Sequence, residues 1–458
     1  MIRSFLAFPA LCLVLSVAPF VSAAQQQQPA TSALDFASLG RDTVNELAAR
    51  QFVKVYARFG QAAASAISAE KLGQIWDSLL AQEGPFQKTY SVSLAVQVGY
   101  HIASVTCAFE KGSLDIVLAF DASGRLVGLH FAPPNSSLPA AIPWNAPSYA
   151  DPSTFHEVDL AISDGQWHLP GTLTLPNGKG PFSAVVLVSG SGPNDGDETI
   201  GPNKPVKDLA WGLASEGIAV LRYPKRTHVY GGGSAADPQN FTVRDEYIDD
   251  ARAAVALLAG RPDINPKRIF LAGHSEGGYL APRIAAGVPQ IAGIIILEGN
   301  TRPIEQLVIA QLRYEANLGG PNAAQIEKMI PEAQQQAKII ESPELKPGTE
   351  VQMLTATVPS SYFLDLRSYD PAATAASLKI PIYVTQGGRD YQVTATDFTH
   401  WKKALAGHSN ATLKLYPSLN HLLIAGSGPS SPVEYEKPAQ HVSPEIIHDL
   451  SSWIQSQH

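Results

Sequence analysis

Cysteine is nearly absent from this sequence, charged residues are sparse, and long apolar runs are missing after the first residues. Only two of the 458 residues are cysteine, and 16% are charged. One of the two cysteines, Cys12, lies in the apolar N-terminal segment. Once that segment is removed, Cys107 has no partner for an intramolecular disulfide. Downstream no stretch of about 18 apolar residues occurs, and the sequence therefore predicts no stable membrane anchor in the mature chain.

Excess positive charge is also lacking. The formal net charge is −8 and no basic tract occurs, which argues against a protein that binds nucleic acid through a positive surface. The hydrophobic fraction of 45% instead indicates a sizeable packed core. A chain of 458 residues is long enough for roughly two or three domains.

Residues 1–23 are typical of a signal peptide. Arg3 supplies a positive start, the stretch from Phe5 to Val21 is largely apolar, and Val21-Ser22-Ala23 offers a small-residue cleavage pattern. A membrane anchor is the alternative, but the stretch is short for a span and prolines interrupt it. We therefore expect a secreted or periplasmic protein.

A small α+β domain is predicted for residues 35–133. Helical patterns at 35–59 and 63–82 precede segments in which apolar residues alternate with small or polar ones. Such alternation is typical of half-buried strands, and helices followed by an antiparallel meander indicate an α+β fold. The proline-rich stretch at 134–154 is predicted to be a linker.

The segment 155–458 has the pattern of an α/β domain. It opens with a predicted strand pair within 158–175, after which short apolar strands alternate with helical segments. This order predicts a mostly parallel sheet with helices on both faces. A helix-rich insert at about 300–370 follows the end of one strand, and we expect it to cap the sheet edge where substrates bind.

The strongest chemical signal is the pentapeptide Gly273-His274-Ser275-Glu276-Gly277, which matches the G-x-S-x-G pattern. An apolar strand pattern precedes it and a helical pattern follows it. A serine on such a sharp strand-to-helix turn exposes its hydroxyl, and the glycines leave room for the backbones that pass close by. Ser275 is therefore the predicted nucleophile.

A serine hydroxyl needs a base, and the histidines late in the chain are the candidates. His421 follows a predicted strand that ends near Pro417, which places it at the same sheet edge as Ser275. His448 falls within the last predicted helix and His441 precedes that helix, so both are weaker alternatives. We predict that His421 is the general base.

The supporting acid is expected after an earlier strand. The apolar run at 380–385 leads into Gly387-Gly388, and Asp390 follows at the tip of that turn. Asp397 is the alternative, but it falls where the next helix should begin, a place where carboxylates serve as caps. Asp390 is therefore predicted to orient His421 and to stabilise its protonated form.

An oxyanion hole needs backbone N–H donors aimed at the reacting oxygen. Glu276, the residue after the nucleophile, is predicted to supply one of them. A glycine-rich loop, Ser189-Gly190-Ser191-Gly192, ends the predicted strand at 184–188. Ser191 of this loop is predicted to supply the second donor, with Gly192 as the alternative.

No cofactor motif accompanies these residues. The glycine-rich loop lacks the third glycine of a dinucleotide fingerprint, and neither a phosphate loop nor an H-E-x-x-H zinc motif occurs. The acidic run at 195–198 is a weak candidate for metal binding, and a solvated turn is the preferred interpretation. For the basic pair Lys225-Arg226, a structural or solvated role is preferred over contact with substrate.

The quoted segments resemble bacterial α/β-hydrolases of the esterase and serine-aminopeptidase-like type. The resemblance rests on 188–196, 221–226, 273–278 and 419–422. It implies hydrolysis of carboxylic esters with a triad of Ser275, Asp390 and His421. Pro224 departs from the pattern, since an Asp usually stands before Lys-Arg in such chains. Residues 35–133 resemble a domain of unknown function with a nuclear-transport-factor-like fold that often precedes these hydrolases.

The predicted function is that of a carboxylesterase that acts on a small-molecule ester through an acyl-serine intermediate, without a cofactor. A peptidase or a thioesterase is the first alternative, because the same triad serves all of these reactions. A non-enzymatic ligand-binding protein is the second alternative. The sequence leaves open the acyl and alcohol groups, the oligomeric state and the role of the N-terminal domain.

Overall fold

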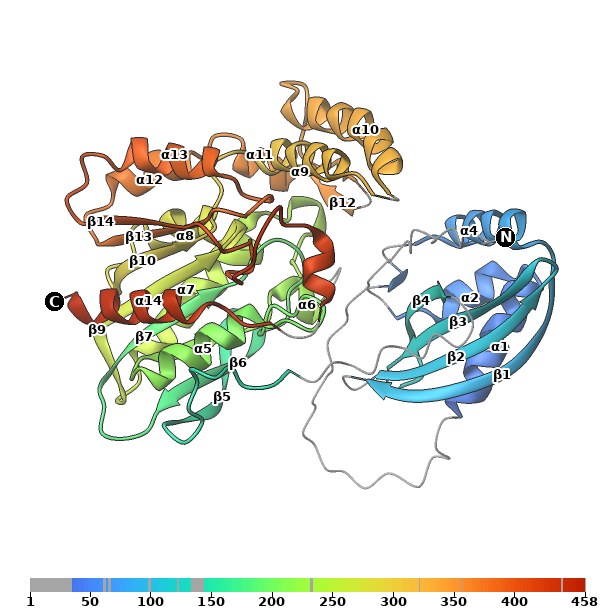
Figure 1. Ribbon diagram of the computed structural model, residues 1–458, viewed down its shortest axis with the longest axis horizontal. Coiled ribbons are helices and arrows are strands. Elements are labelled where there is room, and N and C mark those ends of the chain that lie inside the picture. Colours follow the sequence, from blue (N-terminus) through green and yellow to red (C-terminus); the bar gives the residue numbers. More distant parts are fainter. Residues whose placement is uncertain are drawn as a thin grey trace. The chain divides into compact units, whose positions relative to one another are not determined.

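The computed structural model describes residues 35–457, except for 61–62, 65–66, 98–99, 122, 133–143, 231–233, 321, 355 and 438–439. The predicted signal peptide at 1–23 lies outside the described residues. The chain divides into two compact units (Figure 1). The first contains the described residues up to Ala132, and the second contains nearly all of those from Trp144 on.

The first unit packs helices on one antiparallel sheet (Figure 1). Its described helices are α1 (Phe36–Ala48), α2 (Phe52–Arg58) and α4 (Ala69–Glu83). Its strands, in sheet order, are β1 (Phe86–Gln97), β2 (Tyr100–Phe109), β3 (Gly112–Phe120) and β4 (Leu126–Ala132). Cys107 is fully buried in the core between the helices and the sheet, as a small apolar residue would be.

Local backbone conformation explains where this unit differs from the predicted elements. The helical pattern at 35–59 is divided because Arg50 adopts a φ of 58°, which a right-handed helix cannot contain. The next helix begins at Ala69, where the Ser68 side chain accepts the backbone N–H of Lys71 as a cap. The sequence pattern does not predict β4, because its residues show no regular alternation of apolar and polar side chains.

The second unit is built on a mixed sheet in the order β14-β13-β10-β9-β7-β8-β6-β5. Its strands, in chain order, are β5 (Phe155–Asp164), β6 (Trp167–Pro176), β7 (Phe182–Val188), β8 (Ala219–Arg222), β9 (Ile264–His274), β10 (Ile291–Leu297), β13 (Ile382–Gly387) and β14 (Ala411–Tyr416). All neighbouring pairs from β8 to β14 are parallel, and the β5–β6 pair continues the sheet in antiparallel fashion. The predicted mostly parallel sheet and leading strand pair are therefore confirmed.

Helices cover both faces of this sheet. On one face, α5 (Pro205–Ser215) and α14 (Pro444–Ser456) bury apolar side chains against the central strands. On the other lie α7 (Asp249–Ala259), α8 (Glu276–Ala285), α12 (Pro371–Ser377) and α13 (Ala395–Ala404). A π-helical turn, Arg244–Ile248, directly precedes α7. Part of the predicted linker packs on the helical layer of α5 and α14, because the indole N–H of Trp144 donates to Asp208 of α5 at 2.9 Å.

The insert between β10 and β13 forms the predicted cap. It contains α9 (Ile304–Leu318), α10 (Ala323–Glu341), a hairpin of β11 (Glu350–Met353) and β12 (Ala356–Pro359), and α11 (Ser360–Leu366). In Figure 1 these orange elements gather at one edge of the sheet. The sequence pattern predicts the helices but not the hairpin, whose strands are each four residues long. Within the described part of the chain, no helix has the length and apolar character needed to cross a membrane.

Candidate active site

Ser275 lies on a sharp turn between β9 and α8, near the middle of the sheet. Its φ of 54° is in the left-handed region, where a residue with a side chain is strained. The backbone N–H of Ser275 donates to the carbonyl oxygen of Leu297 in β10 at 2.9 Å, which holds the turn against the neighbouring strand. The turn therefore presents the serine at the carboxyl edge of the parallel strands.

The two glycines of the pentapeptide are required by close backbone contacts. A Cβ atom on Gly277 would lie 2.4 Å from the carbonyl oxygen of Val188, the last residue of β7. A Cβ atom on Gly273 would lie 2.1 Å from the carbonyl oxygen of Gly277. Both distances are far below van der Waals contact, so a side chain at either position would open the turn.

Replacing Gly277 by alanine is expected to lower the free energy of unfolding by at least about 2 kcal/mol, because the added methyl group overlaps backbone atoms that cannot move independently. The measurement is the thermal unfolding midpoint, followed by circular dichroism. Gly407→Ala is the matched control, since a Cβ there meets nothing within 4 Å. Equal midpoints for the two variants would contradict this account of the turn.

His421 and Asp390 form a buried pair at the same edge. Asp390 follows β13, His421 follows β14, and the Nδ1 atom of His421 lies 2.7 Å from Oδ2 of Asp390. The other carboxylate oxygen, Oδ1, accepts the backbone N–H groups of Gln392 at 2.8 Å and Val393 at 3.0 Å. These donors fix the carboxylate in the orientation that meets the imidazole.

Burial sets the protonation state of His421. Removal from water, reinforced by the nearby His274, lowers the pKa of His421 below its ordinary value of 6.5. The imidazole is therefore neutral at neutral pH, and with its Nδ1 proton donated to Asp390 it keeps the lone pair on Nε2. Ser275 and His421 line one pocket of about 290 Å³, so a base and a hydroxyl face the same space.

The glycine-rich loop after β7 is held rigidly beside Ser275. The N–H of Gly190 donates to Oε1 of Glu198 at 2.7 Å, and its carbonyl oxygen accepts from Lys225 at 3.1 Å and from Tyr247 at 2.9 Å. Because the Gly190 N–H is already occupied, the next one along, that of Ser191, is the available donor. Ser191 and Glu276 line a second pocket together with Ser275, whereas Gly192 lines neither pocket.

The alternative candidates have other partners. His441 contacts the carboxylate of Asp208 at 3.1 Å, and His448 lies on α14. Asp397 is completely buried, caps the start of α13 and forms an ion pair with Arg302 at 2.6 Å. None of these three residues lines a pocket with Ser275.

A histidine–carboxylate pair that the sequence does not reveal lies beneath the site. His274 is buried, with Nδ1 at 3.0 Å from Oε1 of Glu198 and Nε2 at 2.8 Å from the carbonyl oxygen of His421. Burial disfavours the charged imidazole, but Glu198 outweighs it and raises the pKa of His274 to about 9. A positively charged His274 thus supports the loop that carries His421.

The acidic run 195–198 is not a solvated turn, as the sequence suggests. Glu198 is 2% exposed and has a φ of 53°, which directs its carboxylate inward to Gly190 and His274. Asp197 pairs with Lys204 at 2.7 Å and with Arg222 at 2.9 Å. In the described part of the chain, no group of three His, Cys, Asp or Glu side chains is placed to hold a metal ion.

Lys225 and Arg226 have structural roles. Lys225 pairs with Glu246 at 3.1 Å, and Arg226 is buried and pairs with Asp250 at 2.5 Å. The Glu276 side chain belongs to the same network, because its carboxyl oxygens lie 3.0 Å from the hydroxyl oxygens of Tyr247 and of Tyr362 in the cap. The sequence gives no local signal for this network, since its members come from separate elements.

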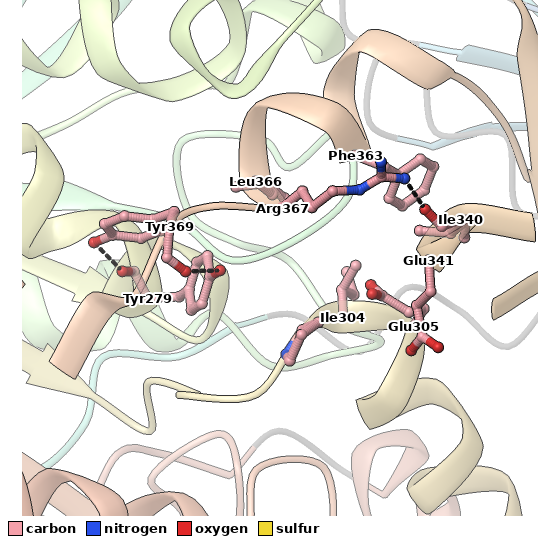
Figure 2. A pocket seen from close by; sticks show the side chains of 10 residues that line it. Tyr279, Ile304, Glu305, Ile340, Glu341, Phe363, Leu366, Arg367 and Tyr369 are labelled. Atoms are coloured by element: carbon pink, nitrogen blue, oxygen red, sulfur yellow. Dashed lines mark hydrogen bonds between the residues drawn. The ribbon is translucent and has the colours of Figure 1, made fainter. Parts of the chain in front are cut away.

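Two neighbouring pockets lie between Ser275 and the cap. The first has a volume of about 90 Å³ and a mixed polar and apolar lining that includes residues of α9, α11 and the loop after β13. The other, which we call the cap pocket, has a volume of about 220 Å³ and shares the lining residues Tyr279, Ile304 and Leu366 with the first. Figure 2 shows that Tyr279 and Tyr369 lie at one end of the cap pocket and the carboxylates of Glu305 and Glu341 at the other.

The chain is similar to known proteins along most of its length. Residues 203–426 match the family described as "Serine aminopeptidase, S33", and residues 41–129 match a "Protein of unknown function (DUF3887)". Esterase EstD of Thermotoga maritima is 39% identical over 85% of this chain and 88% of its own length. A putative esterase, NocK of Nocardia uniformis, is 30% identical over 28% of this chain and 36% of its own length.

Solved structures of esterases are also similar. The Pyrococcus furiosus esterase Pf2001 is 18% identical with a TM-score of 0.44, over 69% of this chain and 97% of that one. Est1E from Butyrivibrio proteoclasticus is 15% identical with a TM-score of 0.43, over 65% of this chain and 98% of that one.

Proposed function

This chain belongs to the esterase family that includes EstD of Thermotoga maritima, and we propose that it cleaves small-molecule carboxylic esters through an acyl intermediate on Ser275. One observation carries the proposal. The buried His421–Asp390 pair, with a contact of 2.7 Å, shares a pocket with a serine on a strained strand-to-helix turn. A serine hydroxyl beside an oriented neutral imidazole is the arrangement that acyl transfer requires.

The first half of the reaction forms the acyl-serine. His421 Nε2 takes the proton of the Ser275 hydroxyl as the serine oxygen attacks the ester carbonyl carbon. Negative charge develops on the carbonyl oxygen, where the backbone N–H groups of Ser191 and Glu276 stabilise it. The tetrahedral intermediate collapses, His421 passes the proton to the leaving alcohol, and Asp390 stabilises the transient imidazolium.

The second half releases the acid. A water molecule, deprotonated by His421, attacks the acyl carbon through the same oxyanion hole, and the proton returns to the Ser275 oxygen. The network around Gly190 matters in both halves, because it keeps the Ser191 N–H in place without reorganisation during the reaction.

We expect short acyl esters to be the best substrates. The pocket on the cap side of Ser275 has a volume of only about 90 Å³, so a long acyl chain that extends towards the cap meets a narrow space there. Turnover of chromogenic esters from acetate to palmitate should therefore give a kcat/KM that falls by about tenfold or more towards palmitate. A maximum at palmitate would contradict the assigned pocket.

A peptidase that releases N-terminal residues is the second candidate, and Glu305 and Glu341 favour it. Glu305 is 8% exposed and, like Glu341, lines the cap pocket, where a substrate ammonium group would meet negative charge. An aminoacyl anilide, tested beside the esters, separates the two functions. Turnover of the anilide without turnover of simple esters would move the assignment to a peptidase.

We also propose that the chain is exported to the periplasm or the medium. The proposal is supported by the positive start, apolar stretch and small-residue cleavage pattern of residues 1–23. Expression of the full chain in a bacterial host, cell fractionation and N-terminal sequencing of the product test it. An uncleaved product that stays in the cytoplasm would contradict it.

A further inference from the structure

Glu298 lies directly behind the proposed triad. It follows β10, the strand between β9, which leads to Ser275, and β13, which leads to Asp390. Its side chain is completely buried and its φ is 50°, a strained conformation for a residue with a side chain. A buried carboxyl group in a strained backbone needs specific partners to persist.

The partners of Glu298 lie in the segment that carries Asp390. Its Oε2 atom accepts the backbone N–H of Gly387 at 2.6 Å and the side-chain amide of Gln386 at 3.1 Å. The same amide donates to the carbonyl oxygen of Val393 at 2.8 Å, and the N–H of Val393 binds Asp390. Glu298 is therefore connected to both ends of the turn that holds Asp390.

The carboxyl group of Glu298 lies close enough to that of Asp390 for a hydrogen bond between them, which would lower the pKa of Asp390. Two carboxyl groups can share a hydrogen bond only if one of them carries a proton. Asp390 already accepts N–H donors from Gln392, Val393 and His421, which favour its ionised form. On Glu298 the N–H donors converge on Oε2, which leaves Oε1, next to the Thr385 hydroxyl at 3.2 Å, to carry the proton.

We propose that Glu298 is a positioning residue of the ester-hydrolysing site: as a neutral carboxylic acid it donates a hydrogen bond to Asp390 and fixes the turn that presents Asp390 to His421. The inference rests on the proposed function, because Asp390 and His421 are the groups through which Glu298 acts. The site then consists of four side chains joined in sequence: Ser275, His421, Asp390 and Glu298. Of these, only Ser275 bonds to the substrate carbon.

The electrostatic surroundings agree with a neutral Glu298. Burial raises the pKa of Glu298 to about 8, and the charge of Asp390 contributes in the same direction, while the Gly387 N–H, His421 and His274 oppose it. Burial also raises the pKa of Asp390, to about 7, although the N–H groups of Val393 and Gln392 and the neighbouring Glu298 oppose this shift. The pKa of Glu298 is thus the higher of the two. Near neutral pH the proton therefore resides on Glu298.

The test compares Glu298→Ala with Glu298→Gln in the full chain. Alanine removes the donor, so kcat for a short ester should fall by about 10- to 100-fold with little change in KM. The acid limb of the kcat/KM profile should also move to higher pH, because an Asp390 carboxylate without this donor stabilises protonated His421 more strongly. Glutamine keeps a neutral donor and should recover most of the lost kcat and restore the limb.

Asp397→Ala is the matched control, since it also removes a completely buried carboxylate at the same sheet edge. This control variant should have a lower unfolding midpoint, but the acid limb of its kcat/KM profile should stay at the same pH as in the parent chain. Equal losses in the Ala and Gln variants of Glu298, or a loss of kcat with an unmoved limb, would overturn the proposal.

A measurement without substrate separates this inference from the proposed function. The low-field proton resonance of the His421–Asp390 hydrogen bond should move in Glu298→Ala and remain close to that of the parent chain in Glu298→Gln. Absence of ester turnover in the parent chain would count against the proposed function, whereas an unchanged resonance in Glu298→Ala would count against the role of Glu298.

Discussion

Replacing Ser275 by alanine is expected to lower kcat for short esters by at least about 10³-fold, because it removes the only atom that forms the acyl bond. The pocket, the His421–Asp390 pair and the oxyanion donors all remain, so KM should change little. Residual activity would come from the oxyanion hole and substrate binding alone. The measurement is steady-state hydrolysis of a chromogenic butyrate ester by the parent chain and the variant.

The matched control for that experiment is Ser418→Ala, which removes an exposed serine on the loop that leads to His421. Alanine has the same conformational range as serine at positive φ, so the unfolding midpoint of Ser275→Ala should stay close to that of the parent chain. Equal turnover in the parent chain and Ser275→Ala would remove Ser275 from the mechanism and direct attention to a ligand-binding function.

Replacing Asp390 by asparagine is expected to lower kcat by about 10³- to 10⁴-fold. The amide would donate its own hydrogen to Nδ1 of His421, which now lies 2.7 Å from Oδ2. The imidazole proton would then move to Nε2, the atom that must accept the proton of Ser275. Geometry is preserved, so the loss arises from the wrong tautomer and from the missing negative charge.

Asp397→Asn provides the comparison for this variant, because Asp397 is the other buried aspartate after β13 and pairs with Arg302. It should lower the unfolding midpoint and leave the mechanism intact. A smaller loss of kcat in Asp390→Asn than in Asp397→Asn would mean that the acid of the triad has been assigned wrongly.

The sequence predicts the general position of the site because parallel strands place their carboxyl ends at one edge. Ser275 is predicted from the glycines around it, which the backbone contacts of Gly273 and Gly277 explain. Asp390 and His421 are predicted from their positions after apolar strands, and the structure brings them together. Chain order and strand ends are local signals, so a single sequence contains them.

Buried carboxyl groups beneath the site could not be predicted in the same way. Glu198 lies in an acidic run typical of a surface turn, and only the close approach of Gly190 and His274 shows that it faces inward. Glu298 had a usable signal, since it directly follows the run Ile294–Leu297 of β10 as Asp390 follows β13. What no pattern predicts is the proton shared between two carboxyl groups, because it depends on distances across strands.

The cap has an evolutionary consequence. Its helices and hairpin form one uninterrupted insertion between β10 and β13, so the residues that select a substrate are encoded separately from most of those that perform the chemistry. This insertion can be exchanged as one continuous gene segment without displacing the catalytic side chains at the edge of the sheet. One junction to preserve is Tyr362, whose hydroxyl oxygen lies 3.0 Å from Glu246 and from Glu276, both outside the cap. A chimera that keeps this tyrosine would inherit a new substrate range together with the old reaction.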